Sequence, residues 1–195
     1  MNKVIKTESF KSAMREIFAI VVGVLLALAV NEWNENRIQT ARANEAISNI
    51  IQEIESNLNL LQIVNKNNLS VVALVESEKS ENNEETQNLK FIPGLQIQDT
   101  AWQTLLSTGV SEFIEFSTLY DVSSIYSLQA IYRKLGFQLV ESMMSNQALA
   151  MIIASNNKIS NSNDLYLTNM KLILEIEKAL LSNYQEKLKK LKPTL

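Results

Sequence analysis

The feature that most constrains this chain is an uninterrupted apolar run near its N-terminus, the fourteen residues from Ile17 to Val30. A helix rises 1.5 Å per residue, so the run reaches about 21 Å of the roughly 30 Å hydrocarbon core of a bilayer. The flanks complete the span, because Phe10 precedes the run and Trp33 follows it, where an indole suits the membrane interface. We therefore expect one transmembrane helix, since no other segment is long and apolar enough to be a second.

The same run has features of a cleaved secretory signal peptide. It follows a charged N-terminal region and contains an A-x-A cleavage pattern at Ala27-Leu28-Ala29. However, the run is at the long end for a signal peptide, and no break separates it from the helical sequence that follows. We expect an uncleaved anchor, with cleavage after Ala29 as the alternative. In either case the C-terminal bulk of the chain crosses the membrane.

Charges on the two sides of the run predict its orientation. Four basic residues stand against two acidic ones in residues 1–16, whereas Glu32, Glu35 and Arg37 follow the run. Positive residues favour the cytoplasmic side, where Arg15 can extend its side chain toward the headgroups. We predict a cytoplasmic tail at 1–16, a transmembrane helix at 17–33 and an extracytoplasmic helical bundle at 34–195.

Small residues recur at four-residue spacing inside the run, at Ala19, Gly23 and Ala27. On a helix they share one face, and small side chains there let a second transmembrane helix approach closely. Such spacings also arise by chance in apolar helices, which is the simpler interpretation. The face is a candidate for transmembrane packing.

The rest of the chain has the composition of long helices, since the whole sequence contains only four Gly and two Pro. Residues 31–78 contain neither. Apolar residues there follow the 4-3-4-3 spacing of a bundle or coiled-coil seam. They are Ile47, Ile51, Ile54, Leu58 and Leu61. The transmembrane helix is therefore expected to continue into a bundle helix.

Asn65 and Asn68 fall in the same frame. Asparagine in a seam weakens apolar packing but can fix its register. The alternative is that Val64, Leu69 and Val71 widen the apolar stripe and leave the two asparagines at its edge. We favour the edge position.

Polar sequences separate the remaining elements, with loops expected at 76–88 and 155–163 and a turn at Phe91-Ile92-Pro93-Gly94. A short helix capped by Asp99 or Thr100 should run through Leu106 and end at Gly109. A longer helix capped by Ser117 should continue to about Ala154, and a last one should run from about Asp164 to Lys192. Apolar stripes mark both long helices, at Ile125, Leu128, Tyr132, Leu135, Leu139 and Met143, and at Tyr166, Met170, Ile173, Ile176, Leu180, Tyr184 and Leu188.

These elements predict an all-α fold, an N-terminal transmembrane helix that continues into an antiparallel bundle of three long helices plus one short helix. The number of chain reversals decides where the lysine-rich C-terminus lies. The sequence leaves open whether that end points toward the membrane or away from it.

Two residue types are absent from the whole sequence, cysteine and histidine. Without them there is no thiol nucleophile and no Ser-His arrangement, and the commonest transition-metal ligand is missing. The carboxylate pairs Glu112 with Glu115 and Glu175 with Glu177 are expected to be ordinary solvated groups. A formal charge of −3 gives no basic face for nucleic acid. We predict no catalytic residues, no bound metal and no cofactor.

About half of the chain, most specifically its N-terminal part, resembles a family of uncharacterised bacterial single-pass membrane proteins that carry a domain of unknown function. The resemblance rests on Arg15-Glu16-Ile17-Phe18, the glycine-containing apolar run, and Val30-Asn31-Glu32-Trp33-Asn34-Glu35-Asn36-Arg37. The family signature is REI, an apolar stretch and VN-x-WNE-x-R. Ala101-Trp102-Gln103, Thr108-Gly109 and the segment from Tyr126 to Tyr132 fit related members. The resemblance is specific over 14–40, and it implies a bacterial inner-membrane protein with an extracytoplasmic helical domain and no established activity.

Within this motif, Trp33 and Arg37 are one helical turn apart, so the guanidinium could lie against the indole. The functional interpretation is a contact with a partner just outside the membrane. The simpler interpretation, which we favour, is that both side chains anchor the helix at the interface.

Three classes of function follow from these features. The leading hypothesis is a membrane-anchored, non-enzymatic interaction or sensory-accessory module. Its partners would be the bilayer and either further copies of itself or another membrane protein. The alternative is a small-ligand-binding bundle that signals through a partner and uses Tyr120, Tyr126, Tyr132 and Trp102, although packing in the core or at its boundary is the simpler role for these aromatic residues. A secreted helical protein with a cleaved signal and an enzyme come after these two.

Overall fold

A computed structural model describes residues 3–78, 91, 92, 96–153 and 162–192. The helices are α1 (Lys3–Glu78), α2 (Thr100–Thr108), α3 (Phe116–Ile153) and α4 (Ser162–Leu191), with a 3-10 turn η2 (Val110–Phe113) between α2 and α3. No strand occurs among the described residues. The predicted all-α fold is therefore confirmed.

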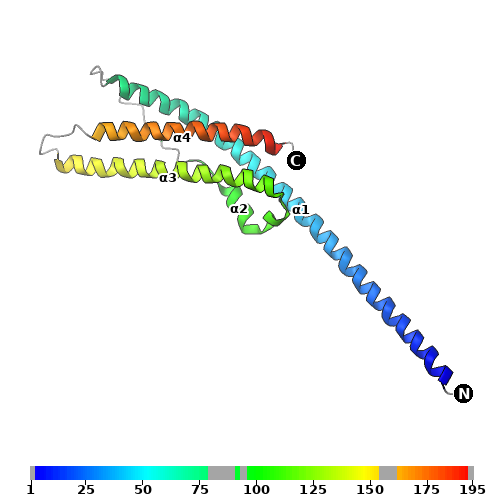
Figure 1. Cartoon of the computed structure of the whole chain (residues 1–195). Coiled ribbons are helices and arrows are strands. Elements are labelled where there is room, and N and C mark those ends of the chain that lie inside the picture. The colour runs from blue at the N-terminus through cyan, green and yellow to red at the C-terminus, as the bar shows by residue number, and fades with distance from the viewer. Residues whose placement is uncertain (1–2, 79–90, 93–95, 154–161, 193–195) are drawn as a thin grey trace.

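Helix α1 is one unbroken helix of 76 residues, which corresponds to a length of about 114 Å. Its N-terminal half projects from the bundle and its C-terminal half forms part of it (Figure 1). From Phe10 onward, where the structure describes the side chains of α1, the first buried residue is Ala43. This single helix confirms the predicted continuity between the apolar run and the bundle. Its physical reason is that no Gly or Pro interrupts the sequence between 31 and 78.

The core lies where α1, α3 and α4 meet, with α4 packed against both of the others. Ile47, Ile51, Ile54 and Leu61 of the predicted seam are buried, and Leu58 packs at its margin. The stripes on α3 and α4 also face the core, through Ile125, Tyr132 and Leu139 on α3 and Met170, Ile173, Leu180, Tyr184 and Leu188 on α4. Each fully buried aliphatic side chain of this kind contributes about 1.5–3 kcal/mol. The predicted Met143 and Tyr166 lie outside the side chains that the structure describes.

Local signals set the ends of α2. Asp99 is its N-cap residue, and Gly109 ends it with a φ of 72°. Glycine reaches this left-handed conformation without the steric cost that a side chain adds. The predicted end at Gly109 is confirmed. The predicted cap of α3 at Ser117 is wrong, because that helix begins at Phe116, and the Ser117 hydroxyl donates to the carboxylate of Glu115 instead.

The lysine-rich end of α4 lies at the end of the bundle from which the apolar half of α1 emerges (Figure 1). Lys192 Nζ lies 2.6 Å from Glu55 Oε1 on α1, and Lys187 Nζ lies 2.5 Å from Asp121 Oδ1 on α3. The lysine-rich end of the chain therefore points toward the apolar half of α1 and not away from it. The predicted loops fall mainly on 79–90 and 154–161, which lie outside the described residues, as do Pro93 and Gly94 of the predicted turn.

Candidate functional site

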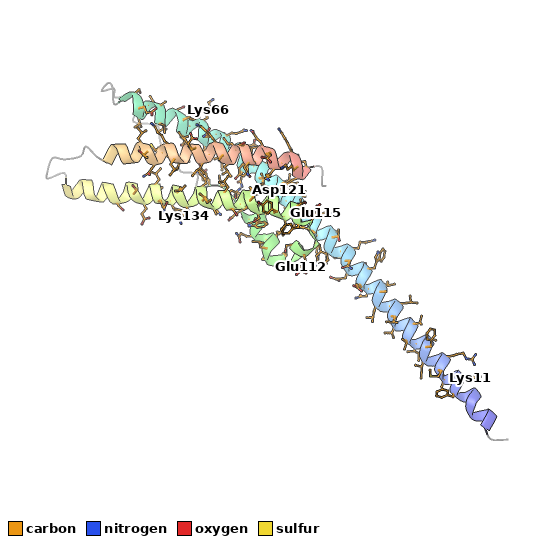
Figure 2. All side chains as sticks on the ribbon, in the orientation of Figure 1. Lys11, Lys66, Glu112, Glu115, Asp121 and Lys134 are labelled. Atoms are coloured by element: carbon orange, nitrogen blue, oxygen red, sulfur yellow. The ribbon has the colours of Figure 1, made fainter. Side chains whose placement is uncertain are left out.

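The apolar half of α1 is long and apolar enough to cross a membrane. Mean hydropathy reaches 2.3 in its most apolar window, and none of that window is buried inside the protein. Its side chains project freely around the helix (Figure 2). Ala19, Gly23 and Ala27 are exposed, and a Cβ added at Gly23 would meet nothing within 4 Å. The bundle leaves this small-residue face uncovered, so its role in packing remains a prediction.

The predicted interfacial residues flank this segment on the same helix. Trp33 is 65% exposed, Arg37 is exposed, and Arg15 Nε donates to the Lys11 carbonyl oxygen at 3.4 Å. In the part of the chain that the structure describes, the one recorded ring contact is elsewhere, between Trp102 and Tyr126. The indole of Trp33 and the guanidinium of Arg37 are thus both available to surroundings outside the protein.

An open groove of about 790 Å³ lies between α1 and α2, on the side of the bundle nearer the apolar half of α1. Its α1 wall runs from Arg42 to Ser56, a length of about 21 Å. Neutral hydrogen-bonding groups dominate both walls, at Asn49, Gln52 and Ser56 on α1 and at Gln98, Thr100, Thr104 and Thr108 on the other side. Ala46, Ala101, Leu105 and Val110 supply the apolar lining, and Arg42, Glu45 and Glu53 supply the charges.

Glu53 fixes one end of this groove because it caps α2 from another helix. One carboxylate oxygen accepts the backbone N–H of Ala101 at 2.9 Å, and the other accepts the hydroxyl of Tyr126 at 2.6 Å. A carboxylate at a helix N-terminus satisfies a free N–H and interacts favourably with the helix dipole. Burial, and then the bond to Glu53, raise the pKa of Tyr126, so this hydroxyl stays a donor. Glu53 therefore positions α2 and needs no ligand to account for its burial.

Two asparagines on α1 hold the segment that leads into α2. We call the described residues 91, 92 and 96–99 the return segment. The Asn57 carboxamide donates to the Gln98 carbonyl at 2.7 Å and accepts its N–H at 3.0 Å. Asn68 pairs in the same way with Ile92, at 2.7 and 2.8 Å. Each carboxamide thus satisfies both backbone polar groups of one residue, as a residue of a neighbouring strand would.

A second buried carboxylate lies deeper in the bundle. Glu177 on α4 is completely buried, and it accepts hydrogen bonds from Asn65 at 2.8 Å, Asn68 at 2.7 Å and the Tyr132 hydroxyl at 2.6 Å. Burial raises the pKa of Glu177, and the three hydrogen bonds oppose that rise without cancelling it. One carboxylate therefore joins α1, α3 and α4, and Asn68 extends this network to the return segment.

Two predictions from the sequence are wrong here. Asn65 and Asn68 are buried in the core and not at the edge of the stripe. Glu177 is also buried, although Glu175 is solvated as predicted and pairs with Lys178 at 2.8 Å. The spacing of the sequence does indicate a buried position, because residue 177 fits a 4-3-4 seam with Ile173, Leu180 and Tyr184. The polarity of glutamate outweighs this spacing, and it favours the neighbouring Ile176 as the seam residue in a prediction from sequence.

The other predicted carboxylate pair is solvated, as expected. Glu112 and Glu115 are exposed and lie near the connection between η2 and α3 (Figure 2). Among the described residues, no group of three or more acidic side chains is placed to hold a metal ion.

The four aromatic residues of the alternative hypothesis do not share a binding pocket. Tyr126 and Tyr132 are buried and bonded to carboxylates, and Trp102 stacks on Tyr126 with ring centroids 5.4 Å apart. Tyr120 is 65% exposed on another face of α3. Two of the four are therefore core residues and Trp102 packs at the margin of the core, which agrees with the simpler interpretation.

Comparisons with protein families, with curated proteins and with solved structures find no match for this chain. The resemblance drawn from residues 14–40 accordingly stays a prediction, and the groove and the buried network are interpreted from their own chemistry.

Proposed function

We propose that this protein is a membrane-anchored, non-enzymatic interaction or sensory-accessory module of the bacterial inner membrane. Its N-terminus would be cytoplasmic and its bundle extracytoplasmic. The observation that carries the proposal is that α1 supplies both the apolar segment and one wall of the groove within a single unbroken helix. A partner seated in the groove would contact the same helix that crosses the bilayer.

The position of the groove supports this function. Its nearest lining residue, Arg42, is twelve residues beyond Val30, which places it about 18 Å from the end of the apolar run. The extracytoplasmic part of a neighbouring membrane protein is therefore within reach of the groove. Neutral amides and hydroxyls line both walls of the groove. Such groups can form hydrogen bonds to the polar surface of a partner without burying an unpaired charge.

A photo-crosslinking residue placed at Thr104, in the α2 wall, tests the groove in intact cells. Ser127, exposed on α3, is the matched control position. We expect a defined covalent adduct from Thr104 and none from Ser127. Equal adducts at the two positions, or none at Thr104, would contradict an interaction through the groove.

The orientation has its own test, a reporter at the C-terminus that is active only in the cytoplasm. The excess of basic residues in 1–16 predicts that this fusion is inactive and that the same reporter at the N-terminus is active. The reverse result would place the bundle inside the cell.

A second candidate function, a receptor for a small ligand, is favoured by the size of the groove. Its volume of about 790 Å³ falls within the range typical of ligand sites. Native mass spectrometry of the full chain released from membranes separates the two functions. A stoichiometric small molecule that is lost on substitution of Thr104 by a bulky residue would favour the receptor.

A further inference from the structure

The buried carboxylate of Glu177 is surrounded by donors. Its Oε1 accepts from the Tyr132 hydroxyl and from Asn68 Nδ2, and its Oε2 accepts from Asn65 Nδ2. In the described part of the chain, no cationic side chain is recorded as a hydrogen-bond or ion-pair partner of this group. The arrangement matches an ionised carboxylate, because both carboxamide nitrogens that face it are donors and cannot accept a proton from a carboxylic acid.

The direction of the Asn68 carboxamide is fixed by its other contacts. The N–H of Ile92 must meet an acceptor, and that acceptor is Asn68 Oδ1 at 2.8 Å. The Nδ2 of Asn68 is therefore committed to the Ile92 carbonyl and to Glu177. Tyr132 can rotate its hydroxyl, and Asn65 can turn its amide, to meet a protonated carboxyl. Asn68 cannot turn without breaking both bonds to Ile92.

We propose that Glu177 is a proton-operated latch that controls how tightly Asn68 holds the return segment against α1. When the carboxylate is ionised, it anchors the Asn68 amide through a charge-assisted hydrogen bond. When it takes up a proton, that bond loses the charge that strengthens it, and the hold on Ile92 weakens. The return segment leads directly into α2, so the latch lies at one end of the chain that forms a groove wall.

Glu177 is the group in this network that titrates under acid. It faces Tyr132 on α3 and Asn65 and Asn68 on α1, while Tyr184 on its own helix interacts electrostatically with Tyr132. Burial raises the pKa values of both tyrosines, which therefore stay neutral. Burial also raises the pKa of Glu177, so it takes up a proton at a higher pH than a solvated glutamate does.

The chain contains a matched internal control for this latch. Asn57 holds the Gln98 peptide through the same pair of hydrogen bonds, and neither residue is bonded to Glu177. A general loosening of the fold by acid would affect both peptides. Titration of Glu177 would affect Ile92 alone.

The test is residue-resolved hydrogen exchange of the full chain in lipid nanodiscs, between about pH 4 and about pH 8 and corrected for intrinsic exchange. We expect the protection factor of the Ile92 amide to fall about tenfold on acidification, which is the typical difference between a hydrogen bond to a charged group and one to a neutral group, while that of Gln98 stays constant. A Glu177→Gln variant should show the low Ile92 protection at every pH.

In the wild-type chain, carbon NMR can follow the titration of the Glu177 carboxyl directly. The pH midpoint of the change in Ile92 protection should coincide with that titration. This comparison needs no variant, so the test stands even if Glu177→Gln folds poorly. Constant Ile92 protection, an equal loss at Gln98, or a midpoint away from the carboxyl titration would each overturn the latch. The test requires neither the groove nor a partner, so its outcome is independent of the proposed function.

Discussion

Replacing Asn68 by alanine perturbs the most connected polar side chain of the bundle. Its carboxamide donates to the Ile92 carbonyl and to Glu177, both at 2.7 Å, and accepts the Ile92 N–H at 2.8 Å. Alanine makes none of these bonds. The substitution leaves both backbone polar groups of Ile92 without their side-chain partner and removes one of the three donors to a buried carboxylate.

The expected loss follows from these three groups. A buried polar group left without a partner costs about 1–3 kcal/mol, and more when the group is charged. Alanine returns roughly half a kcal/mol because it favours the helix more than asparagine does. Because the Ile92 backbone is only half-buried, its two polar groups count near the lower end of this range. We therefore expect Asn68→Ala to lower the free energy of unfolding by about 3–5 kcal/mol, a large share of the stability of an ordinary domain.

Urea unfolding in detergent, followed by the fluorescence of Trp102, measures this loss. The sequence has two tryptophans, so a Trp33→Phe background leaves Trp102, which stacks on Tyr126, as the reporter. Asn59→Ala is the matched control, because Asn59 is exposed on the same helix. The control should change stability by no more than about 0.5 kcal/mol.

A result for Asn68→Ala within about 1 kcal/mol of the control would refute the reasoning. It would mean that water replaces the carboxamide at Ile92 and Glu177 at little cost. The slope of the transition adds a second criterion, since a slope below that of the parent protein would show that the return segment and α2 detach before the rest of the bundle unfolds.

Three further predictions concern other polar or strained positions. Glu177→Gln should remove a pH dependence of stability. Burial raises the pKa of Glu177 in the folded state, so ionising this carboxyl costs stability. The parent should therefore lose stability relative to the variant as pH rises from about 4.5 through the folded pKa. Parallel urea titrations across pH measure this difference, and a constant difference would argue against a raised pKa. Tyr126→Phe should cost about 1–3 kcal/mol, because Glu53 loses a buried donor at 2.6 Å while the ring still packs; thermal unfolding that matches the parent would show that the hydroxyl is dispensable. Gly109→Ala should cost about 1 kcal/mol through its φ of 72°, since a Cβ there meets no other atom within 4 Å, and an unchanged melting temperature would contradict this account.

Much of the fold was predictable because its signals are local. The apolar run, the 4-3-4-3 spacing from Ile47 to Leu61 and the left-handed end of α2 at Gly109 each depend on a contiguous stretch of sequence. Hydrophobic periodicity identifies a helix and its buried face without reference to the rest of the chain. The misplaced cap at Ser117 shows how weakly the same signals fix the first residues of a helix.

The candidate sites were less predictable because their residues are far apart in the sequence. Glu53 caps a helix that begins 47 residues later, and Glu177 meets Asn68 across 109 residues. Polar residues in a seam usually indicate its edge, and that general expectation misplaced Asn65, Asn68 and Glu177. Their burial became favourable only because they satisfy one another.

The sequence alone therefore determined one apolar helix long enough to span a membrane and the helical class of everything after it, since hydrophobicity and helical period belong to each segment separately. The tertiary structure decided the rest. It brought the lysine-rich end of α4 to the side of the bundle where the apolar half of α1 emerges, and it laid the return segment along α1. It also enclosed a carboxylate among donors from α1 and α3, because a buried polar group can be tolerated only where distant parts of the chain supply its partners.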